Sequence, residues 1–171
     1  AHIINATLER NPNLPPEAVE DIIMGCGNPE GAQGHNVGRN AAVLSNLPIT
    51  TGGTTINRYC SSGMQSISMA ASQIMAGCYD TVIAGGAETI SMMQGKQNMD
   101  NFVNERLAEK SPGIYYPMGM TAEVVAKRYN VSREAQDEYA FESQMRTAAA
   151  QQAGAYDDEI IPMETKMLLM N

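Results

Sequence analysis

The pattern of hydrophobic and polar positions predicts an α/β protein. Three short apolar or β-branched runs, at 21–27, 54–56 and 81–84, have the length and composition of buried strands. Apolar residues at three- and four-residue steps separate the runs, as expected for helices. A strand, a helix and a second strand in this order form a βαβ unit, so the sheet should be parallel.

The helix after the 54–56 strand carries the clearest pattern. Its apolar positions recur at helical steps, namely Met64, Ile67, Ala71, Ile74 and Met75. Gly77 stands where a C′ glycine commonly ends a helix. The pattern therefore predicts a helix that begins close to Cys60 and ends just before Gly77.

Shorter or weaker patterns predict the remaining helices. One helix should occupy residues 1–10, where Ile4 and Leu8 lie four apart. A second should follow a glycine-rich loop, with a buried face formed by Val37, Ala41 and Leu44. The last three are expected at 102–110, at 122–129 with a break at Asn130, and from a Ser132 cap toward Gly154.

Composition excludes several classes of function. The 171 residues could form one domain with a real core, and 43% of them are hydrophobic. A net charge of −8 argues against non-specific binding to nucleic acid or to an anionic membrane surface. No apolar stretch approaches the ~20 residues of a membrane span.

The three cysteines, Cys26, Cys60 and Cys78, are widely spaced and odd in number. This spacing speaks against a disulfide framework and against a structural metal site. It favours a reducing, cytoplasmic setting.

Two other motifs fall short of a function. The run Gly25-Cys26-Gly27-Asn28-Pro29-Glu30-Gly31 resembles a dinucleotide fingerprint, but its third glycine comes one place late. A carboxylate also stands where a pyrophosphate would bind, so we reject a dinucleotide site. His35 could serve as a base, but its position in a glycine-rich stretch is more typical of a partly exposed loop residue.

Cys60 stands where the 54–56 strand turns into the following helix. A helix N-terminus presents unpaired N–H groups and the positive end of the helix dipole, and both favour an anion there. They would stabilise a nucleophilic thiolate and could also hold a developing oxyanion. A lone cysteine is more often a small buried core residue, so the position by itself favours that interpretation and leaves the nucleophile as the alternative.

The sequence around Cys60 resembles the corresponding motif of the thiolase family. It reads Asn57-x-x-Cys60-Ser61-Ser62-Gly63-Met64-Gln65-Ser66, and Gly85-Gly86-Ala87-Glu88-Thr89-Ile90-Ser91 follows on the next strand. The likeness is greatest to the degradative 3-ketoacyl-CoA thiolases. It implies a layered α-β-α fold and a catalytic Cys60 that becomes acylated by the substrate.

A second segment carries the resemblance further. Met118-Gly119-Met120-Thr121-Ala122-Glu123 is similar to the thiolase Met-Gly-x-Thr-Ala-Glu stretch, which opens the family's loop domain. The resemblance implies that Met118 binds substrate as an apolar wall near the thioester. It also implies two parts, a partial N-terminal α/β domain over 1–113 and a partial loop domain over 114–171.

The family's activity is acyl transfer between a 3-ketoacyl-CoA, or acetyl-CoA, and CoA through an acyl-cysteine. The resemblance thus implies an acyltransferase of fatty acid β-oxidation, with CoA and acyl-CoA as substrates. It implies no permanently bound cofactor and no metal. Intact members form homo-oligomers that pair along the strand before the nucleophile.

Several family motifs do not occur in these residues: a Gly-His-Pro histidine, a Cys-x-Gly-Gly-Gly cysteine, an Asn-Glu-Ala-Phe segment and an opening Arg-Thr-Pro strand. We therefore expect an N-terminal portion of a thiolase, clipped at both ends, that is inactive alone. Two alternatives stay open. One is a related ketoacyl synthase-type condensing enzyme, and the other is a non-catalytic thiolase-like subunit or partner-binding piece.

Overall fold

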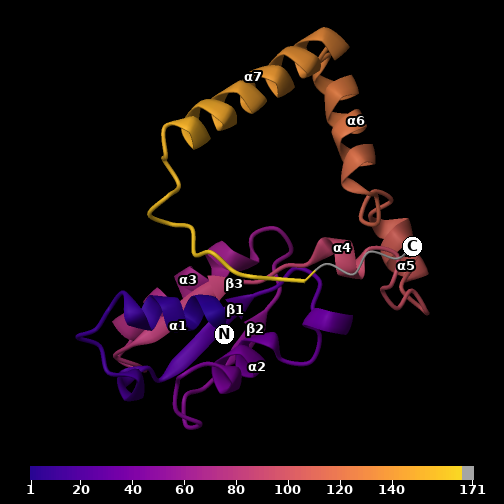
Figure 1. The fold of residues 1–171 in the computed structure, drawn as a ribbon. Coiled ribbons are helices and arrows are strands. Elements are labelled where there is room, and N and C mark those ends of the chain that lie inside the picture. The colour runs from indigo at the N-terminus through magenta and orange to yellow at the C-terminus, as the bar shows by residue number, and fades with distance from the viewer. Residues whose placement is uncertain (167–171) are drawn as a thin grey trace. The chain divides into compact units, whose positions relative to one another are not determined.

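The computed structural model describes residues 1–166, which fall into two compact units. Of the described residues, the first unit contains 1–97 together with 163–166, and the second spans Asn98–Pro162 (Figure 1). The predicted division after residue 113 remains a prediction. None of the helices in residues 1–166 is long and apolar enough to cross a membrane.

The first unit holds a small parallel sheet and its helices. Its elements are α1 (His2–Glu9), β1 (Asp21–Gly25), α2 (Val37–Leu44), β2 (Thr54–Ile56), α3 (Ser62–Met75), β3 (Val82–Gly86) and α4 (Ile90–Met93), with 3₁₀ turns η1 (Pro16–Ala18) and η2 (Gly31–Gln33). The strand order is β2-β1-β3, and both pairs are parallel. The three predicted strands and the parallel βαβ unit are confirmed.

The second unit is helical: α5 (Glu105–Lys110), α6 (Met118–Tyr129) and α7 (Arg133–Gln152). Asn130 has a left-handed backbone, with φ 52°, and ends α6 as predicted. Ser132 caps α7, because its Oγ accepts a hydrogen bond from the Ala135 N–H at 3.2 Å. The beginnings of two helices differ from the prediction. α5 begins at Glu105, where the Asn104 side chain caps it, and α6 begins at Met118.

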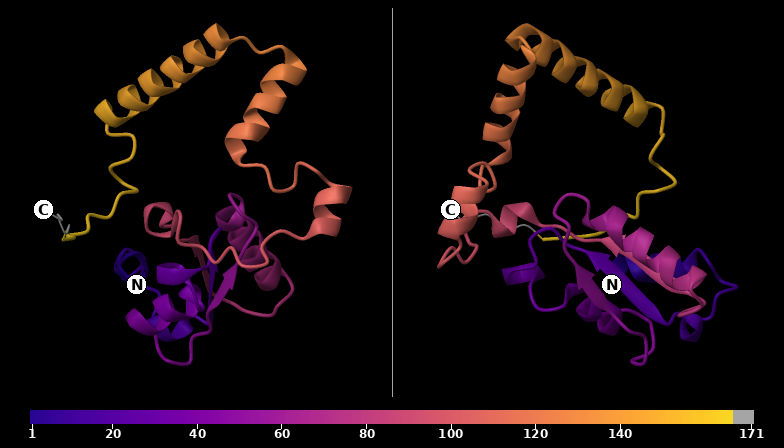
Figure 2. Two further views of the ribbon diagram at one scale, coloured as in Figure 1. Left: turned by 90° about the vertical axis from the view of Figure 1, so that its right-hand side faces the viewer. Right: turned by 180° about the vertical axis from the view of Figure 1, so that it is seen from behind.

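The sheet of the first unit lies between two helical layers, as the views in Figure 2 show. Successive residues of β1 point to opposite faces. Ile22 and Met24 join the core with α1 and α2, whereas Gly25 meets the first turn of α3 on the other face. All five residues of β1 are buried, as expected for a central strand covered on both sides.

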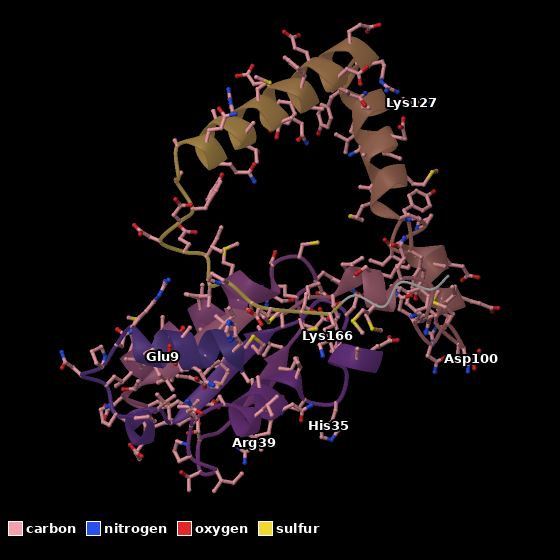
Figure 3. The ribbon with its side chains drawn as sticks, viewed as in Figure 1. Glu9, His35, Arg39, Asp100, Lys127 and Lys166 are labelled. Carbon is pink, nitrogen blue, oxygen red and sulfur yellow. The ribbon has the colours of Figure 1, made fainter. Side chains whose placement is uncertain are left out.

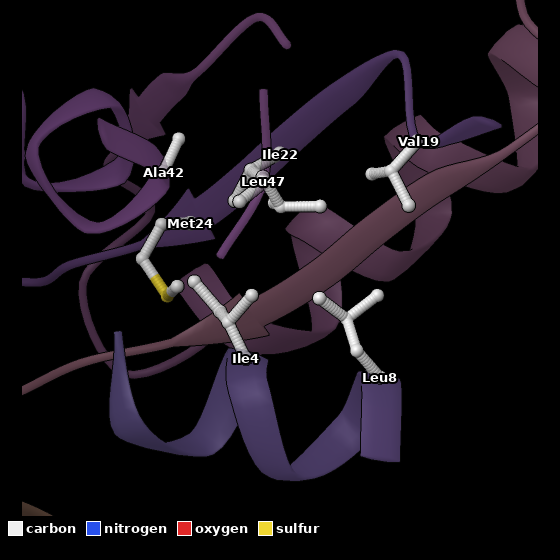
Figure 4. Close-up of a cluster of buried hydrophobic side chains, with 7 residues drawn as sticks. All are labelled: Ile4, Leu8, Val19, Ile22, Met24, Ala42 and Leu47. Carbon is white, nitrogen blue, oxygen red and sulfur yellow. The ribbon is translucent and has the colours of Figure 1, made fainter. Parts of the chain in front are cut away.

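The core beneath α1 and α2 is a cluster of seven buried side chains, drawn in Figure 4: Ile4, Leu8, Val19, Ile22, Met24, Ala42 and Leu47. Ile4 and Leu8 confirm the predicted face of the first helix. The predicted face of α2 is wrong in one position, because Leu44 is 79% exposed and Ala42 is the buried residue. The Asn36 cap holds the start of α2 against β2 and so sets the rotation of the helix. Asn36 Oδ1 accepts from the Thr55 hydroxyl of β2 at 2.8 Å, and Asn36 Nδ2 donates to the Gly53 carbonyl just before β2 at 2.9 Å.

The face of α3 that packs on the sheet is the small, partly polar one. Ser62, Ser66 and Ala70 are its buried residues. The apolar positions whose spacing predicts the helix do not make this contact, since Met64, Ile67, Ile74 and Met75 are exposed. The reason is the close approach of the helix: a Cβ on Gly25 would overlap the backbone of Ser62, so large side chains have no room at this interface.

Candidate active site

Cys60 is exposed and lies at the corner between β2 and α3. It lines a pocket of about 460 Å³ at the carboxyl ends of the three parallel strands, the usual position of ligand sites in α/β sheets. Three loops, one after each strand, build the walls. The lining residues are Gly25, Gly27, Asn28, Tyr59, Cys60, Ser62, Gly63, Gly86, Ala87, Glu88 and Ile90.

A tight corner presents Cys60 to this pocket. Tyr59, the residue before it, has a left-handed backbone with φ 46°, an uncommon conformation for a residue with a side chain. The Ser62 hydroxyl holds this residue from both sides. Its Oγ accepts from the Arg58 N–H at 2.9 Å and donates to the Tyr59 carbonyl at 2.6 Å. Asn57 Oδ1 also accepts from the Tyr59 N–H at 2.8 Å.

The start of α3 gives the corner its electrostatic character. The N–H groups of a first helical turn point back along the axis, here toward the residues that precede Ser62. Together with the helix dipole, they place a positive potential beside Cys60, where a carbonyl oxygen under attack would gain negative charge. Glycine at position 25 allows this turn to lie directly against β1.

The wall opposite α3 is held by hydrogen bonds between distant segments. Glu88 Oε2 accepts from the Gly27 N–H at 2.7 Å. The buried Gln33 side chain donates to Glu88 Oε1 and to the Asn28 carbonyl, and accepts from the Thr89 N–H. The loops after β1 and β3 are thereby joined beside the pocket.

Cys26 differs chemically from Cys60. It is buried at the end of β1. Burial raises the pKa of the Cys26 thiol; a hydrogen bond from the Asn28 backbone lowers it and the negative charge of Glu88 raises it further. Cys26 is therefore a protonated thiol in the core. A buried core cysteine was also the alternative that the sequence left open for Cys60, which is instead exposed.

The structure brings Cys60 together with the Gly-Gly-x-Glu stretch, because both line the same pocket. Met118 is the first residue of α6 in the second unit and is 70% exposed, and its role remains a prediction. His35 lies on the exposed loop before α2, as Figure 3 shows. In residues 1–166, no three His, Cys, Asp or Glu side chains are grouped so that they could hold a metal ion.

Sequence reasoning missed Gln33. It is 3% exposed, yet it belongs to a glycine-rich stretch that reads as a surface loop. No periodicity marks a single buried amide, and its partners lie up to 56 residues away in the chain. Glu88 was visible only as part of a motif, without any indication of which groups its carboxylate contacts.

Fold and site together define an α/β protein with an exposed cysteine at the N-terminal end of a helix, beside a Gly-Gly-x-Glu wall. Comparison with known proteins agrees with this description. The model of the thiolase N-terminal domain matches residues 1–169. The chain therefore belongs to the thiolase family, and the resemblance stated from its motifs is confirmed.

Curated relatives are longer than this chain. It is 51% identical over 148 residues to a 3-ketoacyl-CoA thiolase of Bacillus subtilis (strain 168), which covers 85% of this chain and 37% of the relative. It is 40% identical over 165 residues to a 3-ketoacyl-CoA thiolase of Aliivibrio salmonicida (strain LFI1238), covering 95% and 42%. An acetyl-CoA acetyltransferase of Chromobacterium violaceum is 40% identical over 176 residues, covering 95% and 44%. The chain thus spans about two fifths of the length of these relatives.

Proposed function

We propose that this chain supplies the nucleophile of a thiolase-type acyl transfer, and that Cys60 is that nucleophile. The substrate would be a 3-ketoacyl-CoA or acetyl-CoA, and the second substrate CoA. The observation that carries the proposal is the position of Cys60: exposed, at the start of α3, and lining a pocket shared with Glu88.

In the first half-reaction, the Cys60 thiolate attacks the carbon of the 3-keto group. The carbon–carbon bond to the thioester side breaks, the acyl group stays on sulfur as a thioester, and acetyl-CoA leaves after its new carbanion takes up a proton. In the second, the CoA thiolate attacks this thioester, forms acyl-CoA and returns the Cys60 thiolate. The first-turn N–H groups of α3 are suited to hold the oxyanion in either step.

Other parts of the proposal rest on the resemblance. The proton transfers need a general base, and we assign it to residues outside these 171 positions, because the family's Gly-His-Pro motif does not occur in them. We keep Met118 as an apolar wall of the acyl site. We also propose degradative β-oxidation in the cytoplasm as the setting, and a homo-oligomer as the working assembly.

Acylation of the chain by acetyl-CoA tests the proposal. The purified protein is incubated with acetyl-CoA and quenched in acid, and acetyl groups are mapped by peptide mass spectrometry at Cys26, Cys60 and Cys78. Circular dichroism on the same sample confirms the fold. We expect a hydroxylamine-sensitive acetyl thioester on Cys60 well before either other cysteine.

Cys78 is the matched control, because it is a second exposed free cysteine in the same molecule. If a folded sample carries acetyl equally on Cys60 and Cys78, or on neither, the assignment of Cys60 is wrong. That result would instead favour a non-catalytic thiolase-like subunit.

A further inference from the structure

We propose that Gln33 and Glu88 form a strut that sets the width of the Cys60 pocket and so governs its selectivity for a thioester over a small electrophile. Neither residue is proposed to react. Both are positioning residues, and the inference rests on the function proposed above for Cys60.

Every polar atom of the Gln33 side chain is used. Its Nε2 donates to the Asn28 carbonyl at 2.7 Å and to Glu88 Oε1, and its Oε1 accepts from the Thr89 N–H at 2.7 Å. The partners fix the direction of the amide, because a carbonyl and a carboxylate only accept and an N–H only donates. A glutamine in this place cannot be reversed without losing all three bonds.

Glu88 completes the strut at the other end. Its Oε2 accepts from the Gly27 N–H at 2.7 Å, so one carboxylate joins a backbone group after β1 and a side chain from η2. Gly27 is enclosed at this point. A Cβ there would lie 2.8 Å from Glu88 Oε2 and 3.4 Å from the Tyr59 carbonyl, so the three loops of the pocket meet around this glycine.

The residues joined by the strut are pocket walls. Gly27 and Asn28 lie on one side, Glu88 on another, and all three line the same cavity as Cys60. Gln33 itself does not line the pocket, and at 3% exposure it has little contact with solvent. Its hydrogen bonds hold the walls in register, while Ser62 independently holds the cysteine corner.

The experiment compares two reactions of Cys60 in the folded chain, acetylation by acetyl-CoA and alkylation by chloroacetamide. Chloroacetamide is small and reports the exposure and reactivity of the thiol, whereas the thioester must also fit between the walls. The ratio of the two rates is measured by peptide mass spectrometry for wild type, Gln33→Met, Gln33→Glu and the double variant Gln33→Glu with Glu88→Gln. Gln73→Met is the matched control, because Gln73 lies on α3 away from the pocket.

Gln33→Met keeps the length of the side chain and removes all three bonds. We expect the ratio of acetylation rate to alkylation rate to fall about tenfold or more, because displaced pocket walls would no longer align the thioester with Cys60. Gln33→Glu should lower it as well, because two carboxylates then face each other. The double variant restores a donor and an acceptor at the contact between positions 33 and 88, but the Asn28 carbonyl still lacks its donor, so it should recover only part of the ratio. Gln73→Met should leave the ratio unchanged.

An unchanged ratio in folded Gln33→Met would overturn the strut, and so would a double variant no better than Gln33→Glu alone. The second comparison still decides the matter if Gln33→Met does not fold. Wild type separates the two proposals. If acetyl-CoA acetylates Cys60 no faster than Cys78 in wild type, the proposed function fails. If Cys60 is acetylated faster in wild type and the rate ratio is unchanged in every Gln33 variant, only the strut fails.

Discussion

Helix α3 has a free cysteine near each end, and the two ends differ in almost every other respect. Cys60 precedes the N-terminus and Cys78 follows the C-terminus, and both are exposed. At the C-terminal end, Gly77 is left-handed with φ 71°, and the N–H groups of Gly77 and Cys78 donate to the carbonyls of Ile74 and Gln73. This is a Schellman motif, and it satisfies the terminal carbonyls locally.

The N-terminal end is also closed by local hydrogen bonds, but it depends in addition on a tertiary contact. Its corner is left-handed at Tyr59 and held by Ser62, and its first turn rests on Gly25. The helix dipole is also reversed, because its positive end lies toward Cys60 and its negative end toward Cys78. Exposure therefore does not distinguish the two thiols. They differ in which end of α3 lies beside the sulfur and in the pocket walls around it, and under the proposed function these differences make Cys60 the nucleophile.

Replacing the two thiols should give the largest difference. In the acetyl-CoA assay, Cys60→Ser should lower acetylation at position 60 by roughly a thousandfold or more, because the serine hydroxyl is a far weaker nucleophile without a nearby base. Cys78→Ser should change it by less than about twofold, which is the measurement's own control for a surface substitution. Equal losses in the two variants would remove the distinction between the helix ends.

Glycine substitutions at the two ends should differ in stability. Gly25→Ala should destabilise the chain by about 3 kcal/mol, because its Cβ would overlap the backbone at the start of α3. Gly77→Ala should cost about 1 kcal/mol, since only the left-handed backbone is strained and no atom lies within 4 Å of the new Cβ. Urea unfolding measures both, with Gly63→Ala as a control in an uncrowded position. A smaller loss for Gly25→Ala than for Gly77→Ala would contradict the packing argument.

Substitutions of the two adjacent serines, Ser61 and Ser62, test whether the hydrogen bonds around Tyr59 position Cys60. Ser62→Ala removes both hydrogen bonds around Tyr59, so we expect a loss of about 1–2 kcal/mol in stability and a roughly tenfold smaller lead of Cys60 over Cys78 in acetylation. Ser61→Ala should leave the lead intact, because the Ser61 side chain makes no capping hydrogen bond to α3. If both variants behave alike, the Ser62 hydroxyl does not position Cys60.

We expect the smallest effect for the buried thiol of Cys26, which changes how stability depends on pH. The folded-state pKa of Cys26 is raised above its ordinary value of 9.0, mainly by burial. Its contribution to stability is therefore present below about pH 9 and is lost as the pH rises through the higher folded-state pKa. The loss in stability between pH 8 and pH 10 should thus be smaller in Cys26→Ala than in wild type, as urea unfolding at each pH would measure. An identical loss in the two proteins would mean that Cys26 titrates as an exposed thiol does.

Features with a local cause were predictable from sequence. The run before Gly25 is a strand, Gly77 ends α3, and Ser132 caps α7, because each depends on side chains within a few residues. The motif around Cys60 also indicated a helix start and a family. The Gln33–Glu88 contact could not be predicted, because it joins segments 55 residues apart through two side chains that show no periodic pattern.

Residues close to each end of α3 specify where the helix begins and ends and that Cys60 precedes it, and the motifs beside it identify the family. Which face of α3 meets the sheet depends on contacts with β1 and β3, and so it follows from the folded chain alone. The apolar stripe predicted a helix but not its rotation, since the glycines at the ends of β1 and β3 allow only the small Ser62 and Ser66 to fit, and Ser66 Oγ donates to the Gly85 carbonyl at 2.8 Å. Close backbone approach, rather than hydrophobicity along the chain, therefore sets the rotation of the helix that follows the candidate nucleophile.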